Sequence, residues 1–133
     1  MKRVKELTGI TQLDIDNYGL SFEKGLNELY LFSTNKNNCL LPLYSYGNDY
    51  SIVDYNLKLY NFSQFSKFVK WSYMFYNIRD IFDIAIDTSQ YTSGTVYKAF
   101  NIIPESKIKV HDPLWDSTSL FLSLNYMYEN NII

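Results

Sequence analysis

The apolar pattern changes its period near Asn61, and this switch constrains the fold more than any other feature of the sequence. Upstream, residues 50–55 alternate in the way that a strand presents opposite faces. Downstream, aromatic residues recur at helical spacing. The sequence therefore predicts strands over about 39–44, 50–55 and 57–60, then a helix over about 63–87 with a break near Asn77.

Short connections between these predicted strands favour an antiparallel arrangement. Gly47-Asn48-Asp49 is a turn signal, and parallel neighbours would need a crossover of about a dozen residues or more. Further helices are predicted over Ser21–Phe32, with Ser21 as the cap, and from Ser117 onward. The predicted fold class is α+β: an antiparallel sheet (meander) with helices packed on one face, in a single domain over 1–133.

The helical stripes also predict the core. A chain of 133 residues that is 47% hydrophobic can bury a core without disulfide or metal staples. The segment 95–103 could be a strand or a helix, with a strand favoured, and 107–110 is interpreted as a short strand. The last helix is expected to bury Leu120, Phe121, Leu124 and Tyr128. The predicted main core comprises Phe65, Phe68, Val69, Ile81, Phe82, Leu120, Phe121 and Leu124.

Charge and cysteine usage limit the compartment and the partners. The chain has one cysteine, no charged-then-apolar leader at its start and no run of about 20 apolar residues. These features predict a cytoplasmic protein. A net charge of −2 gives no general attraction to nucleic acid. We therefore expect neither direct nucleic-acid binding nor membrane binding.

Residues that could support catalysis are few. His111 is the single histidine and directly precedes Asp112, so a triad converging from separate segments is not indicated. His111 is interpreted as a strand-end residue and Cys39 as a buried structural thiol. No histidine or cysteine pair predicts a metal site, and the scattered glycines predict no phosphate loop or cofactor. We expect no enzyme activity, although an unrecognised pair of carboxylates stays an alternative.

An acidic stripe stands out on the predicted helix. At about 100° per residue, Asp80, Asp83 and Asp87 share one side, with Ile84 beside them. Such a stripe has two interpretations: a solvated helix face, or a docking surface for a basic protein. Thirteen tyrosines offer a second candidate surface, although AT-rich codon usage would also explain their number.

The middle of the chain resembles the SUKH superfamily over about residues 22–75. The resemblance rests on a helix with Phe22, Leu26 and Leu29, followed by the runs Leu40-Leu41-Pro42-Leu43-Tyr44, Tyr50-Ser51-Ile52-Val53-Asp54-Tyr55 and Asn61-Phe62-Ser63-Gln64-Phe65-Ser66-Lys67-Phe68-Val69. Bacterial members of that superfamily are largely immunity proteins of toxin systems. The resemblance implies a sheet-and-helix scaffold that occludes a toxin domain, and it implies no specific binding residues.

These observations predict an immunity protein that binds a cognate bacterial toxin domain, expected to be a nuclease, and occludes its active site. The predicted partner-binding residues are Asp80, Asp83, Ile84 and Asp87, facing a basic surface of the toxin. The alternative is a phage or mobile-element inhibitor, similar to anti-CRISPR factors, that blocks a nucleic-acid-binding enzyme. Both targets present basic grooves, so an acidic surface suits either.

Overall fold

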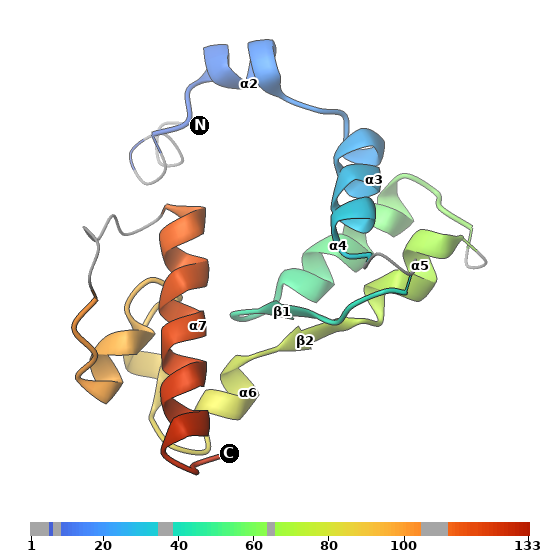
Figure 1. The fold of residues 1–133 in the computed structure, drawn as a ribbon. Helices are drawn as coiled ribbons and strands as arrows, with labels where there is room; N and C mark the ends of the chain where they lie inside the picture. The colour runs from blue at the N-terminus through green and yellow to red at the C-terminus, as the bar shows by residue number, and fades with distance from the viewer. Residues whose placement is uncertain (1–5, 7–8, 35–38, 64–65, 105–111) are drawn as a thin grey trace. The chain divides into compact units, whose positions relative to one another are not determined.

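The computed structural model describes residues 6, 9–34, 39–63, 66–104 and 112–133. Packing divides the chain into two compact units, residues 12–78 and residues 1–11 with 79–133 (Figure 1). That residues 1–133 act as one domain stays a prediction. The first unit contains α2 (Gln12–Tyr18), α3 (Phe22–Phe32), β1 (Leu43–Ser45), α4 (Asp49–Leu59), α5 (Lys67–Ser72) and β2 (Phe75–Asn77). The second contains α6 (Arg79–Phe82), the 3-10 helices η1 (Thr88–Gln90) and η2 (Val96–Phe100), and α7 (Pro113–Glu129).

The core of residues 12–78 is aromatic and lies between α3, α4 and α5. Its buried residues are Leu26, Leu57, Phe68 and Trp71, and Trp71 is completely inaccessible. Tyr30 packs edge-on against both Phe68 and Trp71, with ring centroids 5.7 and 5.8 Å apart. Such T-shaped pairs add to the stabilisation that burial of the rings provides.

The two described strands are parallel, so the predicted antiparallel meander is wrong. Leu43 pairs with Phe75 and Ser45 with Asn77 in a two-stranded sheet. Helices α4 and α5 form the crossover that a parallel pair requires (Figure 1). The described part of the chain is dominated by helices, so the predicted α+β class with helices on one face of a sheet is also wrong. Of the predicted strand over 39–44, only its end lies in β1, and Leu40 makes an isolated bridge to Thr34.

The predicted strands over 50–55 and 57–60 are instead helix α4. Tyrosines and the β-branched pair Ile52-Val53 suit a strand, but Tyr50, Val53 and Leu57 also recur at i, i+3 and i+7. The helical alternative places Leu57, which is 2% exposed, in the core beside Leu26 and Phe68. Burial on one helical face therefore overrides the local strand preference.

Asn61 closes the end of α4, whereas the sequence pattern offered Asn61 or Ser63 as the cap of the next helix. Its φ of 55° is left-handed, the N–H of Asn61 bonds the Lys58 carbonyl at 3.0 Å, and the N–H of Phe62 bonds the Leu57 carbonyl at 2.9 Å. This is a Schellman arrangement, in which a left-handed residue closes the helix. The same left-handed asparagine followed by an apolar residue recurs after η2, at Asn101, and after α7, at Asn131.

This geometry predicts opposite effects of glycine at two asparagines of the same region. At position 61 glycine adopts positive φ freely, so Asn61→Gly should leave the free energy of unfolding unchanged or slightly raised, whereas Asn61→Ile should lower it by about 1–2 kcal/mol. Asn56 lies within α4, and its side-chain amide donates to the Ile52 carbonyl at 2.8 Å. Glycine at position 56 loses this hydrogen bond as well as some helix propensity, so it should lower the free energy of unfolding by about 0.5–1 kcal/mol. Urea denaturation of the three variants measures these differences, and equal losses for the two glycine variants would contradict the left-handed role of Asn61.

The predicted helix over 63–87 is divided in the structure. Ser66 accepts the N–H of Phe68 and begins α5, which ends at Ser72. Residues 75–77 then form β2, so the expectation that 63–76 is helical fails at its end. Helix α6 is a single turn that stops at Phe82. The helix is interrupted because residues 75–77 pair with β1. At the two ends of this pairing, the N–H of Leu43 donates to the Met74 carbonyl and the N–H of Ile78 donates to the Ser45 carbonyl.

In residues 79–133 the long helix α7 packs on η2, where the sequence favoured a strand over 95–103. Asp112 caps α7 by accepting the N–H of Leu114 at 3.0 Å, so the helix begins before the predicted cap Ser117. Trp115 packs edge-on against Tyr97 and donates its indole N–H to the Gly94 carbonyl at 2.9 Å.

The face that α7 buries differs from the predicted one. Its buried residues are Trp115, Ser119, Ser123 and Met127. Phe121 and Tyr128, which were expected in the core, are 66% and 72% exposed. Small serines allow close packing, and the Ser123 hydroxyl bonds the Ser119 carbonyl within the helix at 2.8 Å.

The remaining core predictions have mixed outcomes. Phe68 and Phe82 are buried, as predicted. Val69, Ile81, Leu120 and Leu124 are only half-buried, whereas Phe65 lies outside the described residues, as do 107–110. Within the part of the chain that the structure describes, no helix has the length and apolar character needed to cross a bilayer.

Candidate protein-binding surface

The segment from Asp80 to Asp87 is a series of turns around a buried anchor. Phe82 is completely inaccessible, and its carbonyl accepts the N–H groups of Ala85 and Ile86 at 2.9 and 3.0 Å. The backbone therefore winds past the aspartates without forming the continuous helix on which the stripe was predicted. Asp80, Asp83, Ile84 and Asp87 are nevertheless all exposed. We call these four residues the acidic segment.

Asp83 has a structural role within the acidic segment. Its Oδ1 accepts the Thr88 hydroxyl at 2.5 Å and the Thr88 N–H at 3.3 Å. The same hydroxyl oxygen accepts two N–H groups of Arg79, at 3.2 and 3.1 Å. Thr88 is 1% exposed, so this hydrogen-bond network joins the Asp83 carboxylate to a buried residue and fixes the turn. Asp83 itself stays exposed to solvent.

Asp87 caps η1 with both of its carboxylate oxygens. The Ser89 hydroxyl donates to Oδ1 at 2.6 Å, the Ser89 N–H donates to it at 3.0 Å, and the Gln90 amide donates to Oδ2 at 3.0 Å. These hydrogen bonds favour the ionised form and hold the pKa of Asp87 below its ordinary value of 3.8. Asp87 therefore keeps its negative charge at neutral pH.

The lowered pKa of Asp87 determines how its contribution to stability changes with pH. The ionised cap stabilises the fold above pH 3.8, and this contribution is lost as pH falls through the lower pKa of the folded state. NMR titration of the side-chain carboxyl should give Asp87 a pKa below 3.8, and Ser89→Ala should raise it toward that value. Ser117→Ala, which removes an exposed hydroxyl on α7, is the control. An unchanged Asp87 pKa in Ser89→Ala would show that Ser89 does not stabilise the charge.

Ile84 supplies the apolar part of the acidic segment. Its side chain is 69% exposed beside Asp83. Carboxylates outnumber cations in the described part of 79–133: the carboxylates are Asp80, Asp83, Asp87, Asp112, Asp116 and Glu129, and the cations are Arg79 and Lys98. The segment therefore exposes one large apolar side chain within a stretch of sequence that is rich in exposed carboxylates.

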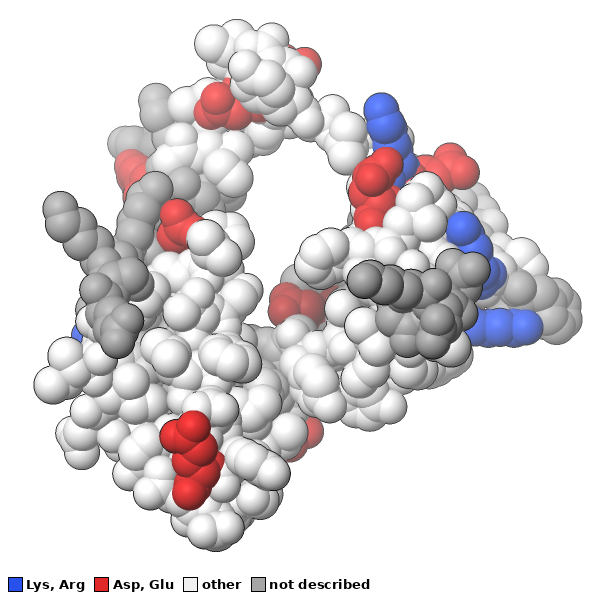
Figure 2. Space-filling view, viewed as in Figure 1, with Lys and Arg blue, Asp and Glu red and all other residues white. Residues whose placement is uncertain are grey.

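The tyrosines of residues 12–78 form a second exposed group. Pairing of β1 with β2 places Tyr44 opposite Tyr76, with ring centroids 5.9 Å apart. Both side chains are about half exposed, and Tyr55, Tyr60 and Tyr73 are more so. The Tyr44–Tyr76 contact depends on the parallel pairing that the sequence pattern did not predict. In Figure 2 most of the visible lysines and arginines lie on the side of α3 and α5, and a smaller basic patch is seen at the left edge.

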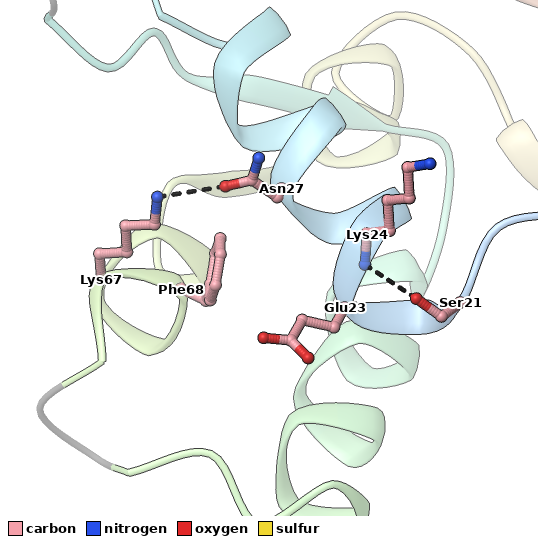
Figure 3. A pocket seen from close by; sticks show the side chains of 6 residues that line it. All are labelled: Ser21, Glu23, Lys24, Asn27, Lys67 and Phe68. Carbon is pink, nitrogen blue, oxygen red and sulfur yellow. Dashed lines mark hydrogen bonds between the residues drawn. The ribbon is translucent and has the colours of Figure 1, made fainter.

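A shallow pocket of about 390 Å³ lies between α3 and α5 (Figure 3). It is lined by Ser21, Glu23, Lys24, Asn27, Lys67 and Phe68. The Lys67 ammonium bonds Asn27 Oδ1 at 3.3 Å and lies 4.4 Å from the Tyr30 ring centroid. Through these contacts Lys67 joins α5 to α3. The pocket lining carries both acidic and basic side chains, so its charge favours no single class of ligand.

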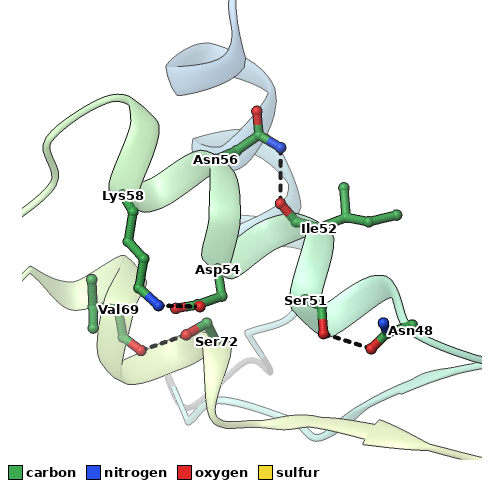
Figure 4. A network of polar contacts seen from close by, with 8 residues as sticks. All are labelled: Asn48, Ser51, Ile52, Asp54, Asn56, Lys58, Val69 and Ser72. Atoms are coloured by element: carbon green, nitrogen blue, oxygen red, sulfur yellow. Dashed lines mark hydrogen bonds and ion pairs between the residues drawn. The ribbon is translucent and has the colours of Figure 1, made fainter.

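Polar contacts around α4 are likewise structural (Figure 4). Lys58 and Asp54 form an ion pair of 2.6 Å one helical turn apart. The hydrogen bond that the Lys58 ammonium donates to Asp54 raises the pKa of Lys58 above its ordinary value. Ser72 donates to the Val69 carbonyl within its own helix at 2.7 Å.

The two residues considered for catalysis, Cys39 and His111, have different outcomes. Cys39 is exposed, so its interpretation as a buried thiol is wrong. His111 lies outside the described residues. Among those that are described, no group of three histidine, cysteine or acidic side chains could hold a metal ion.

Comparison with known proteins gives no match, whether with family models, with curated proteins or with solved structures. The function is therefore inferred from the residues of the chain itself.

Proposed function

We propose that this protein is an immunity protein that binds a cognate bacterial toxin domain, a nuclease, and occludes its active site. The observation that carries the proposal is the acidic segment, in which exposed Ile84 is flanked in the sequence by three exposed aspartates. A nuclease binds a polyanion and therefore presents a basic groove. The acidic segment has the charge and the apolar centre to fit such a groove.

The two kinds of residue have different roles in the proposed contact. The aspartates attract the basic surface over distance and raise the rate of encounter. Ile84 contributes apolar burial after contact, worth roughly 1.5–3 kcal/mol for complete burial. Asp83 and Asp87 are already held by hydrogen bonds, so little side-chain freedom is lost when they bind.

The proposal is tested by using the whole chain as bait in its native host. The expected prey is a toxin domain whose nuclease activity stops when one equivalent of this protein is added. Ile84→Asn should weaken that inhibition by about tenfold, because it removes the apolar burial and leaves the charges. The matched control is Ile52→Asn on α4, where Ile52 is 61% exposed.

Other outcomes separate the alternatives. A captured nucleic-acid-binding enzyme of a defence system, inhibited in the same way, would favour the phage or mobile-element inhibitor. A captured protein whose activity is unaffected would contradict inhibition altogether. Equal inhibition by Ile84→Asn and by the parent protein would move the contact away from the acidic segment, with the tyrosines of residues 12–78 as the next candidate.

A further inference from the structure

A second pocket, of about 270 Å³, lies between α4 and α5 within residues 12–78. Its floor is apolar: Leu57 is 2% exposed and belongs to the core, and Phe62 and Val69 are half-buried against that core. Tyr50 and Tyr73 line its sides, and their ring centroids lie 6.4 Å apart with the ring planes tilted by 36°. These residues can cover an apolar or aromatic group of a small ligand.

The charged groups of this pocket come from one ion pair. Asp54 and Lys58 both line the pocket, and their side chains are joined at 2.6 Å. In Figure 4 the pair lies on the side of α4 that faces Val69 of α5. The pKa of Lys58 is raised by its hydrogen bond to Asp54 and the charge of Asp54, and also by Tyr50 and Tyr73. The Lys58 ammonium therefore lies close enough to both tyrosines to interact with them.

Each member of the ion pair can bind a further polar group. An ammonium has three N–H donors and a carboxylate has two acceptor oxygens, whereas the bond from Lys58 Nζ to Asp54 Oδ2 uses one of each. The side chains of Lys58 and Asp54 are 74% and 30% exposed, so solvent reaches both. A ligand with an anion and a cation close together can place its anion against Lys58 and its cation against Asp54.

Size and charge balance limit the class of ligand. At about 270 Å³ the pocket is slightly smaller than the roughly 300 Å³ of the smallest drug-sized sites, so it suits a ligand of about one residue. A ligand with a single charge would bring a like charge close to one member of the ion pair, which is unfavourable. A zwitterion avoids this repulsion because each of its charges faces an opposite one.

We infer that this pocket binds a free α-amino acid with an aromatic side chain. The ring of the ligand lies between Tyr50 and Tyr73 above Leu57, its carboxylate faces Lys58, and its ammonium faces Asp54. This inference does not rest on the proposed function.

NMR titration of the isotope-labelled full chain with L-phenylalanine tests the inference. The amide resonances of Asp54, Lys58 and Tyr73 should shift with a dissociation constant of about 1 mM, in the range expected for so small a ligand. Phenylpropanoate, which lacks the ammonium, and phenethylamine, which lacks the carboxylate, should each bind about fivefold more weakly. Equal binding of all three compounds would show that the ion pair does not recognise the ligand. Unshifted resonances at about 20 mM L-phenylalanine, twenty times the expected constant, would overturn the inference.

Two variants locate the ligand in the pocket. Lys58→Gln should weaken L-phenylalanine and phenylpropanoate about fivefold and leave phenethylamine no weaker, because only the first two carry a carboxylate. Tyr73→Ala, at a site that is 68% exposed, should weaken all three compounds, because it removes an aromatic wall. The matched control is Lys70→Gln, which removes the same charge from an exposed site on α5. If Lys58→Gln binds L-phenylalanine as the parent protein does, or if Lys70→Gln weakens it equally, the ligand is not held by this ion pair and the inference is wrong.

Discussion

Removing the three charges of the acidic segment together should weaken partner binding by about tenfold or more, mainly by slowing association. The variant is Asp80→Asn, Asp83→Asn and Asp87→Asn. Asparagine is the appropriate replacement because it still offers an oxygen to Thr88 and Ser89, which Asp83 and Asp87 bind, and it is a good helix cap. Loss of binding then reports lost charge and not a lost turn.

Charge reversal should have a larger effect than neutralisation. The second variant carries Asp80→Lys together with Asp83→Asn and Asp87→Asn. It places a positive charge against the basic partner, and like charges across an interface oppose association. Lysine at position 83 is less informative, because it would remove the acceptor that holds buried Thr88. The parent protein should bind more slowly as salt rises, and the triple asparagine variant should show a smaller salt dependence.

A matched control removes three charges elsewhere. Glu23→Gln, Glu28→Gln and Asp49→Asn change exposed acids of residues 12–78 and give the chain the same net charge as the triple asparagine variant. Surface plasmon resonance against the purified partner measures both rates for each protein. Equal association rates for the control and the acidic-segment variant would mean that net charge alone attracts the partner. Unchanged binding in both would leave the acidic segment a solvated surface.

The sequence predicts helices well where capping and apolar spacing agree. Ser21 caps α3 by accepting the N–H of Lys24, and Leu26 is buried, as the pattern indicated. Between 50 and 60 the two signals disagree, because tyrosines and β-branched residues alternate while Leu57 follows a helical period. Only the tertiary core beside Phe68 and Trp71 decides between them. Recognising Asn61-Phe62 as a helix stop would have given the right answer.

Exposure of the acidic segment was predictable, and its geometry was not. Aspartates flanking Phe82 indicate a solvated side whether the backbone is a helix or a series of turns. Their hydrogen bonds to Thr88 and Ser89 depend on η1, which no periodic pattern marked. The face of α7 was unpredictable for a different reason: apolar residues occur around the whole helix, so spacing alone did not choose between Phe121 and Met127.

Truncating Trp71 should cause the largest loss of stability, roughly 3–5 kcal/mol for Trp71→Ala. The side chain is completely buried and packs edge-on against Tyr30 and Phe75, the latter with ring centroids 5.1 Å apart. Alanine leaves a cavity between α3 and α5 that the surrounding rings cannot fill without moving. Trp71→Phe keeps an aromatic ring and should lose less. Urea denaturation followed by circular dichroism measures the difference.

The same variants test whether residues 1–133 unfold as one domain. The chain has two tryptophans, Trp71 in residues 12–78 and Trp115 in α7, so Trp115 alone reports by fluorescence once Trp71 is replaced. If the chain is one cooperative domain, Trp71→Ala must lower the Trp115 midpoint together with the circular dichroism midpoint, because two-state unfolding gives coincident transitions. Suppose that the Trp115 fluorescence midpoint is the same in Trp71→Ala and Trp71→Phe, while the circular dichroism midpoint is lower in Trp71→Ala. This result would show that residues 79–133 unfold independently and that the single-domain prediction is wrong.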